Sequence, residues 1–124
     1  MSTHRIIPIF TSRGDVDAYL VYPYVYNRLG EWIGWVTPER DIYSVHGLYV
    51  GWISNDMRVL RKLSDAFDHP RRSVPPAPPR INTPPTNPLA PLMAELPFGI
   101  MDVLLEHPDL LPSVDFGEGR EDMD

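Results

Sequence analysis

Acidic side chains in the first half of the chain are the first candidates for chemistry. Catalysis by carboxylates needs two of them in one cleft, or one beside a nucleophile. Asp17 stands out because it occupies a strand position that is apolar, Ile33 or Val50, in two related segments. A charge at an exposed sheet edge, where it discourages pairing with other chains, explains Asp17 better than a functional acid does. The other acids of this half lie in or beside predicted turns, so we predict no catalytic residue and a protein that is not an enzyme.

Metal and thiol chemistry find no support in the residue types. The chain has no cysteine, and no two of its histidines, His4, His46, His69 and His107, stand at metal-ligand spacing. Disulfide bonds, thiolate nucleophiles and the usual zinc sites are therefore excluded. We expect no metal and no cofactor.

Aromatic residues are the strongest indication of a binding surface. All three tryptophans and all six tyrosines precede Leu63. Exposed aromatic faces bind proteins, sugars or cationic head groups, and buried ones supply the core of a small domain. The predicted interaction residues of this half are Trp32, Trp35, Tyr49 and Trp52. A small-ligand domain that binds a carbohydrate or a cationic head group through the three tryptophans is the alternative function.

Charge differs between the two halves of the chain. Residues 1–62 hold seven Lys and Arg against six Asp and Glu, whereas residues 63–124 hold four against eleven. Nucleic-acid backbones are bound by clustered positive charge, so we expect no nucleic-acid partner. The N-terminus lacks the apolar core of a signal peptide, and no apolar run reaches the ~18 residues that span a bilayer. We therefore expect no membrane association and a cytoplasmic location.

A hairpin motif that recurs about every 17 residues must position these side chains. Thr11–Gly14, Asn27–Gly30 and Ser44–Gly47 each begin with a small hydrogen-bonding residue and end with glycine. In such a turn the first side chain bonds to the backbone, and the glycine takes a positive φ that closes a hairpin with a bulge. Short β-favouring runs flank each turn, which predicts three hairpins. Val59–Phe67 is interpreted as a degenerate fourth hairpin without the turn glycine.

Glycines and tryptophans of the repeat carry a family resemblance. A Gly-x-x-x-Gly-Trp spacing occurs twice, with an aromatic residue four positions before the first glycine and a proline-rich tail behind. This pattern resembles the four-fold beta flower domains, small bacterial domains without an established activity. The resemblance covers about residues 5–67 and implies four hairpins around a pseudo-four-fold axis. The predicted structural glycines are Gly14, Gly30, Gly34, Gly47 and Gly51.

Proline dominates the segment that follows. Pro70–Pro97 holds ten prolines in 28 residues, which is typical of a stiff solvated spacer, or alternatively of a polyproline II segment that docks on a partner. From Leu89 onward, the i, i+3, i+4, i+7 spacing of apolar residues favours one or two short amphipathic helices. Helices this short form when they dock on their own domain, a second copy or a partner. The apolar positions are Leu89, Leu92, Met93 and Leu96, and then Ile100, Val103 and Leu104.

The predicted fold is all-β, with three to four hairpin repeats in a quasi-symmetric flower or barrel-like arrangement and a proline-rich C-terminal tail that contains one or two short helices. The divisions are a β-hairpin repeat domain (1–67), a proline-rich linker (68–88), short amphipathic helical segments (89–111) and a disordered acidic tail (112–124). The predicted function is a non-enzymatic protein-interaction or scaffolding module that binds a protein partner or a second copy in a homo-oligomer. It would dock through the aromatic hairpin surface and a helical anchor made of Leu92, Leu96, Ile100 and Leu104.

Overall fold

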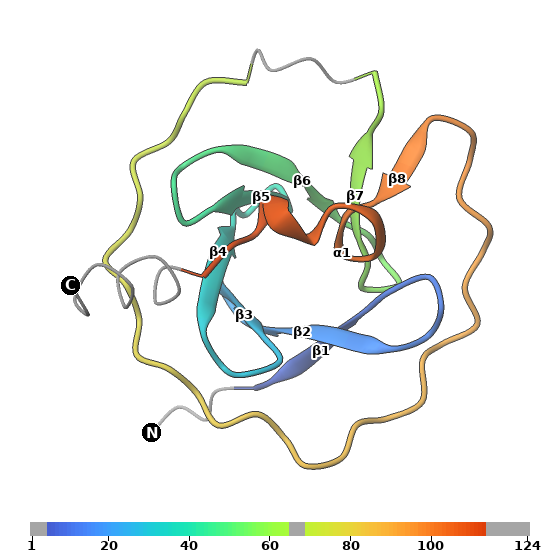
Figure 1. The fold of residues 1–124 in the computed structure, drawn as a ribbon, viewed down its shortest axis with the longest axis horizontal. Coiled ribbons are helices and arrows are strands. Elements are labelled where there is room, and N and C mark those ends of the chain that lie inside the picture. The colour runs from blue at the N-terminus through green and yellow to red at the C-terminus, as the bar shows by residue number, and fades with distance from the viewer. Residues whose placement is uncertain (1–4, 65–68, 114–124) are drawn as a thin grey trace.

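One antiparallel sheet of eight strands, paired in sequence order, makes up the fold. The computed structural model of the chain describes residues 5–64 and 69–113. Its sheet curls so that the strands surround a common centre (Figure 1). The predicted all-β class is confirmed. The elements are β1 (Ile7–Phe10), β2 (Val16–Val21), β3 (Tyr24–Asn27), β4 (Trp32–Val36), β5 (Asp41–Ser44), β6 (Tyr49–Ile53), β7 (Val59–Lys62), β8 (Ile100–Asp102), α1 (Val103–Glu106) and the 3-10 turn η1 (Pro108–Leu110).

The three predicted hairpin turns form as expected. In the turn between β3 and β4, Gly30 N donates to Asn27 O at 3.0 Å, and the Asn27 side chain accepts from the backbone of Leu29 and Glu31. Each of the three hairpins has a register shift just before its turn, which is the predicted bulge. Gly14, Gly30 and Gly47 have φ of 89°, 82° and 81°, a region that glycine adopts without strain.

Two of the three connections between hairpins, β4–β5 and β6–β7, repeat the same turn, which the sequence pattern did not reveal. Thr37 N donates to Asp41 O and Arg40 N to Thr37 O, and Ser54 begins an equivalent turn that ends with Met57. Arg40 and Met57 take the place of glycine, with φ of 73° and 63°. The left-handed conformation is strained for a side chain, so it is held by its surroundings. Arg40 donates through Nε to Ile53 O at 3.0 Å, which is one such restraint.

The fourth hairpin differs from the prediction. Its second strand was expected at Asp65–Phe67, which lies outside the described residues. The strand that pairs with β7 is β8, with Lys62 opposite Ile100 and Leu60 opposite Asp102. A distant segment therefore completes the last hairpin, and Ser64 stands where the other three turns have glycine.

The core lies inside the curled sheet and includes the C-terminal elements. Met101 from β8, Val103 and Leu104 from α1, and Leu111 are buried in one cluster with the inward residues of the hairpins. In Figure 1, α1 crosses the middle of the ring. The core thus contains residues from both sides of the predicted boundary at residue 67. The inward hairpin residues are Ile9, Ala18, Leu20, Val25, Ile33, Val36, Ile42, Val50, Ile53 and Val59.

Residues 69–99, here called the strap, run round the outside of the hairpins between β7 and β8 (Figure 1, yellow to orange). The strap docks on the turns through its backbone: Arg72 N donates to Gly47 O at 3.0 Å and Ile81 N to Gly30 O at 3.1 Å. A methyl group on Gly30 would lie 2.0 Å from Ile81 O, and one on Gly47 would lie 2.4 Å from Arg72 O. Two of the predicted turn glycines therefore serve a second purpose, which is close approach of the strap.

Partial burial recurs along the strap every three residues. Residues 75, 78, 81 and 84 are half-buried, and the period resumes at residues 90, 93, 96 and 99. Three residues per turn is the geometry of a polyproline II helix, which suits this proline content. The strap therefore turns one residue in three toward the hairpins.

The helical prediction for the start of the tail is wrong. The prediction of one or two short helices in the tail is confirmed by α1 and η1 within residues 103–110, but residues 89–99 form no helix. The i, i+3 spacing of Leu89 and Leu92, and of Met93 and Leu96, fits a three-residue period as well as it fits a helix. Pro88, Pro91 and Pro97 break helices but suit the extended form. The predicted acidic tail falls on residues 114–124 for the most part, outside the described residues.

Candidate functional site

Two of the four aromatic residues predicted to form a binding surface are buried, and the other two are half-buried. Trp32 and Trp35 are 6% and 8% exposed and form a second cluster with Tyr43 and Val45. Trp35 stacks on Tyr43 with ring centroids 5.6 Å apart, and Trp32 Nε1 donates to Gly34 O at 2.7 Å. The cluster therefore holds neighbouring hairpins together. Of the three tryptophans, Trp52 is the one that is half-buried, in a shallow hollow with Arg40 and Lys62.

The four predicted anchor residues of the tail do not share one face. Leu104 is buried in the core, and Ile100 is half-buried in β8. Leu96 is half-buried in the strap, whereas Leu92 is fully exposed. The anchor therefore divides into residues that complete the protein's own core and one that faces outward.

Leu92 belongs to an exposed row on the strap. Leu89, Leu92 and Phe98 are 95%, 101% and 104% exposed, and they occupy every third position except the one taken by Glu95. They alternate with Ala90, Met93 and Leu96, the half-buried residues that contact the hairpins. We call Leu89, Leu92 and Phe98 the ridge. Leu89 and Leu92 were noted in the sequence as helical positions, but Phe98 was missed; a three-residue period in a proline-rich segment is the signal that would have found all three.

The part of the sequence that contains the ridge has acidic residues and no basic ones. From Ile81 to Gly119 the chain has no Lys or Arg, while Glu95, Glu106 and Asp109 are exposed. Complementary charge guides partners toward such a surface and disfavours others. The ridge is therefore an apolar row within an acidic region.

A network of polar side chains joins the first hairpin to the fourth. Asp102, which is 1% exposed, accepts from Ser12 N and Ser12 Oγ, both at 2.7 Å. Arg58 Nη1 donates to Ser12 Oγ at 2.9 Å, and its Nη2 donates to Ala94 O of the strap at 3.1 Å. Asp102 also accepts from Leu105 N and so caps α1. We call Ser12, Arg58 and Asp102 the closure cluster, since it links the strands at the two ends of the sheet.

Asp56 supports the closure cluster through Arg58. Its carboxylate accepts from Arg58 Nη2 at 2.7 Å and from Ser54 Oγ. Burial acts to raise the pKa of Asp56, but the hydrogen bonds from Arg58 and Ser54 outweigh it and hold that pKa below the usual value. The carboxylate is thus kept ionised to orient the guanidinium.

The singled-out acid Asp17 lies in β2 and is half-buried. Burial raises its pKa, Arg28 opposes the rise, and the nearby acids Asp102 and Asp15 add to it. It lines a shallow hollow with Arg13 and Arg28 at the first turn. The described residues include no cluster of three or more His, Cys, Asp or Glu side chains that could hold a metal ion.

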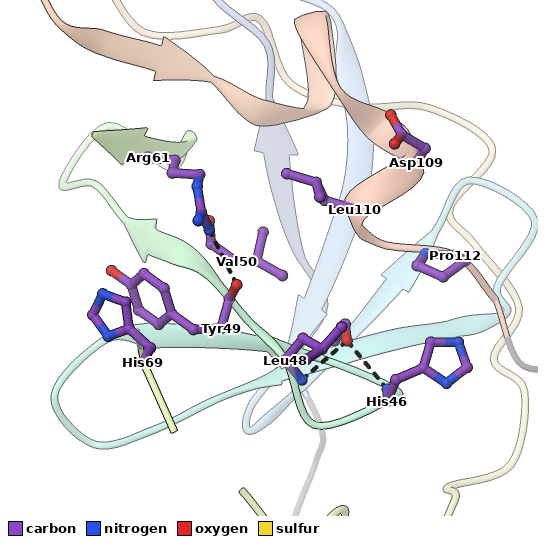
Figure 2. A pocket seen from close by; sticks show the side chains of 10 residues that line it. His46, Leu48, Tyr49, Val50, Arg61, His69, Asp109, Leu110 and Pro112 are labelled. Carbon is purple, nitrogen blue, oxygen red and sulfur yellow. Dashed lines mark hydrogen bonds between the residues drawn. The ribbon is translucent and has the colours of Figure 1, made fainter. Parts of the chain in front are cut away.

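A partly open hollow lies beside the third hairpin turn (Figure 2). Its volume is about 190 Å³, and its walls come from the β5–β6 hairpin, β7, the start of the strap and η1. The Tyr49 ring stacks on the His69 ring at 3.8 Å and forms one wall. Tyr49 is a predicted interaction residue, whereas the remaining lining was missed because it converges from four segments. The lining residues are Ser44, His46, Leu48, Tyr49, Val50, Arg61, His69, Asp109, Leu110 and Pro112.

Arg61 forms part of this hollow although it is buried. Its Nη1 donates to Tyr49 O at 3.1 Å and to Val50 O at 3.0 Å, so the guanidinium braces the backbone of β6 from the neighbouring strand. The guanidinium also lies 5.7 Å from the centre of the Tyr49 ring, within range of a cation–π contact. Asp109 lies on the opposite side in Figure 2.

Comparison with known proteins agrees with this architecture. The family model described as the 4-fold beta flower protein matches residues 7–100 of the chain. The match extends from β1 through the strap to the first residue of β8, well beyond the repeats that carry the resemblance in the sequence. No curated protein and no solved structure matches the chain significantly. In the described part of the chain, no helix has the length and apolarity needed to cross a bilayer.

Proposed function

The chain belongs to the 4-fold beta flower family, and from this premise we propose that it is a non-enzymatic protein-interaction module that docks through the ridge. The observation that carries the proposal is the exposure of Leu89, Leu92 and Phe98, three large apolar side chains with almost no contact to their own fold. The proposal moves the docking surface from the hairpin aromatics to the strap, since Trp32 and Trp35 serve the interior.

The strap holds the ridge in a form suited to recognition. Its inward residues and its backbone bonds to Gly30 and Gly47 attach it to a folded domain. An extended segment that is already ordered loses little conformational entropy when it binds. Apolar anchors on a fixed scaffold then enter pockets of a partner, where buried large side chains supply most of the binding energy.

The partner that fits is a protein with an apolar groove and basic residues at its rim. Side chains three positions apart on a polyproline II helix point in the same direction, and aromatic-lined grooves recognise that geometry. Glu95 lies between Leu92 and Phe98 along the row, so a basic group beside the groove would pair with it. A second copy of the chain is the less suitable partner, because it would bring Glu95 toward another acidic ridge.

Site-specific photocrosslinking in the full chain tests the proposal. A benzophenone amino acid at Phe98 should crosslink to a discrete protein in extract from the source cells, and L89S together with L92S should abolish the product. The matched control carries the same crosslinker at Leu29, which is 70% exposed on the second hairpin turn. Identical products at the two positions, or a Phe98 product that survives the serine substitutions, would refute docking through the ridge, and a crosslink to a second copy would show self-association instead.

A further inference from the structure

Trp52 is the counterpart of Trp35 in the next copy of the hairpin repeat. Trp35 lies opposite Tyr24 on one neighbouring strand and opposite Tyr43 on the other. Its ring stacks on Tyr43 with centroids 5.6 Å apart, and Tyr24 packs against the same cluster. Two aromatic neighbours therefore cover Trp35 and leave it 8% exposed.

Both of these neighbours are different around Trp52. It lies opposite Asp41 in β5 and opposite Leu60 in β7, at the two positions that hold tyrosine around Trp35. Among the described residues, no aromatic ring stacks on its indole. The indole is half-buried and borders the shallow hollow with Arg40 and Lys62. The sheet thus carries one tryptophan that its own fold does not cover.

Hydrogen-bonding side chains surround this indole. The hollow has a volume of about 640 Å³, within the ~300 to 1,000 Å³ of ligand pockets. In the described part of the chain, the carboxylate of Asp41, the amide of Asn55 and the ammonium group of Lys62 make no hydrogen bond or ion pair. We call Trp52, Asp41, Asn55 and Lys62 the Trp52 platform. Donors and acceptors are therefore free beside a flat apolar surface.

Arg40 fixes one side of the hollow. Its φ is 73°, and its Nε and Nη2 donate to Ile53 O at 3.0 Å and to Ser54 O at 2.8 Å. These bonds hold the guanidinium against the β6–β7 connection. A strained backbone that its surroundings hold in place is found at ligand sites, where it contributes to pre-organisation. This side of the hollow is therefore in place before a ligand binds.

The lining favours a neutral ligand with both an apolar face and hydroxyl groups. A quaternary ammonium group is bound by a cage of aromatic rings, whereas here two cations stand beside the Trp52 ring. A purely apolar ligand would bury the polar groups of the platform without partners. A pyranose ring meets both requirements, because its axial C–H groups pack on an indole and its hydroxyls exchange hydrogen bonds at the rim. The charged side chains, two of each sign, are Glu39, Asp41, Arg40 and Lys62.

We infer that the Trp52 platform is a binding site for a neutral pyranose sugar, independent of the protein-docking ridge. The C–H face of the sugar lies on Trp52, the Asp41 carboxylate accepts from its hydroxyls, and Asn55 and Lys62 donate to them. The indole covers one face of the sugar only. This favours the galactose configuration, whose axial 4-hydroxyl leaves the opposite face apolar.

Titration of the full chain with methyl β-D-galactopyranoside tests this site. Isotope-labelled tryptophan gives one indole N–H signal in the NMR spectrum for each tryptophan. We expect a saturable shift of the Trp52 signal, with a Kd of about 1 to 10 mM for one sugar ring on an open surface. The signals of Trp32 and Trp35 should stay unchanged, because both indoles are buried.

Three further ligands check the chemical class. Methyl β-D-glucopyranoside, which differs in the configuration at carbon 4, should bind more weakly than the galactoside. Choline and glycerol, which carry a cation and hydroxyls without a ring respectively, should give no saturable shift. Absence of saturation with the galactoside, equal shifts of all three indoles, or equal or tighter binding of any of the three other ligands would overturn the assignment.

Substitutions beside the indole check the position of the site. D41A removes the acceptor and should weaken binding of the galactoside at least about tenfold. D15A is the matched control, an exposed acid in the first hairpin turn, and should leave the Kd unchanged. If D41A fails to fold, N55A at an exposed position of the β6–β7 connection replaces it and should weaken binding at least about twofold. An unchanged Kd in the folded variant would refute this site.

Discussion

The first three hairpins and the fourth reach the same shape by different means. Each of the first three closes through a turn of four residues in which the bond that closes the turn is local, as between Asn27 and Gly30. The fourth pairs β7 with β8, which is separated from it by the strap. A local turn needs only its own residues, whereas a long-range pairing needs the strap to dock and the closure cluster to form. The fourth hairpin is therefore where sensitivity to distant substitutions should concentrate.

Removing the carboxylate of Asp102 should give the largest effect on stability. D102A leaves Ser12 N and Ser12 Oγ without their buried acceptor and removes the cap of α1, so the free energy of unfolding should fall by about 3 kcal/mol. Urea denaturation measures the change. D109A is the matched control, since the Asp109 side chain is 79% exposed, and it should change stability by less than about 0.5 kcal/mol. Equal effects of the two substitutions would remove the distinction between the fourth hairpin and the others.

Turn glycines separate local closure from docking of the strap. All three glycines have positive φ, so G14A should cost about 1 kcal/mol through backbone strain alone. G30A should cost about 2 to 3 kcal/mol, because its new methyl group also displaces Ile81 O, whereas the methyl group at residue 14 would have ordinary contact with Ala90 at 3.7 Å. Thermal unfolding compares the two. Faster proteolysis of the strap in G30A than in G14A would show that the additional cost arises there; equal stability losses would mean that strap docking contributes little.

Neutralising Asp17 should change stability less than the glycine substitutions do, and should raise it instead of lowering it. Burial raises the pKa of Asp17, so its ionised form destabilises the folded state above that pKa, and the penalty disappears below the unfolded pKa near 3.8. At pH 7, D17N should therefore raise Tm by about one to two degrees, which corresponds to roughly a few tenths of a kcal/mol in a domain of this size. Near pH 3, D17N should have no effect on Tm. A Tm gain that persists at pH 3 would assign the effect to packing instead of charge.

Ridge substitutions should leave stability nearly unchanged. Leu92 makes almost no contact with the fold, so L92S should alter the free energy of unfolding by less than about 0.5 kcal/mol. M93S replaces the half-buried neighbour and should cost more, since it removes contact between the strap and the hairpins. Urea denaturation of the two variants checks the assignment of outward and inward positions. A larger loss of unfolding free energy for L92S than for M93S would reverse the assignment of outward and inward positions.

Prediction from sequence succeeded where structure depends on neighbouring residues. The turn residues Asn27 and Gly30 identified a hairpin because a hydrogen-bonding side chain and a positive φ are properties of residue types. The same logic missed the turns that end at Arg40 and Met57, because tertiary contacts hold those side chains in a conformation usually left to glycine. The hollow was missed for a related reason, since its walls meet only after four segments have packed.

Apolar spacing was informative but ambiguous. Leu89, Leu92, Met93 and Leu96 satisfy a helical period and a three-residue period alike, and the prolines between them decide in favour of the second. The burial of Trp32 and Trp35 could not be deduced either, because a strand presents side chains to both faces and the sequence does not state which face another layer covers.

By itself the sequence determined the all-β class, the first three hairpins and membership in a repeat family, because each rests on hydrogen bonds and φ preferences within a few residues. Tertiary structure decided which segment completes the fourth hairpin, that the strap wraps the turns, and which apolar side chains remain outside. Those outcomes depend on pairing across about 40 residues, as between β7 and β8, where the entropy of closing a long loop must be offset by burial that no local pattern reports.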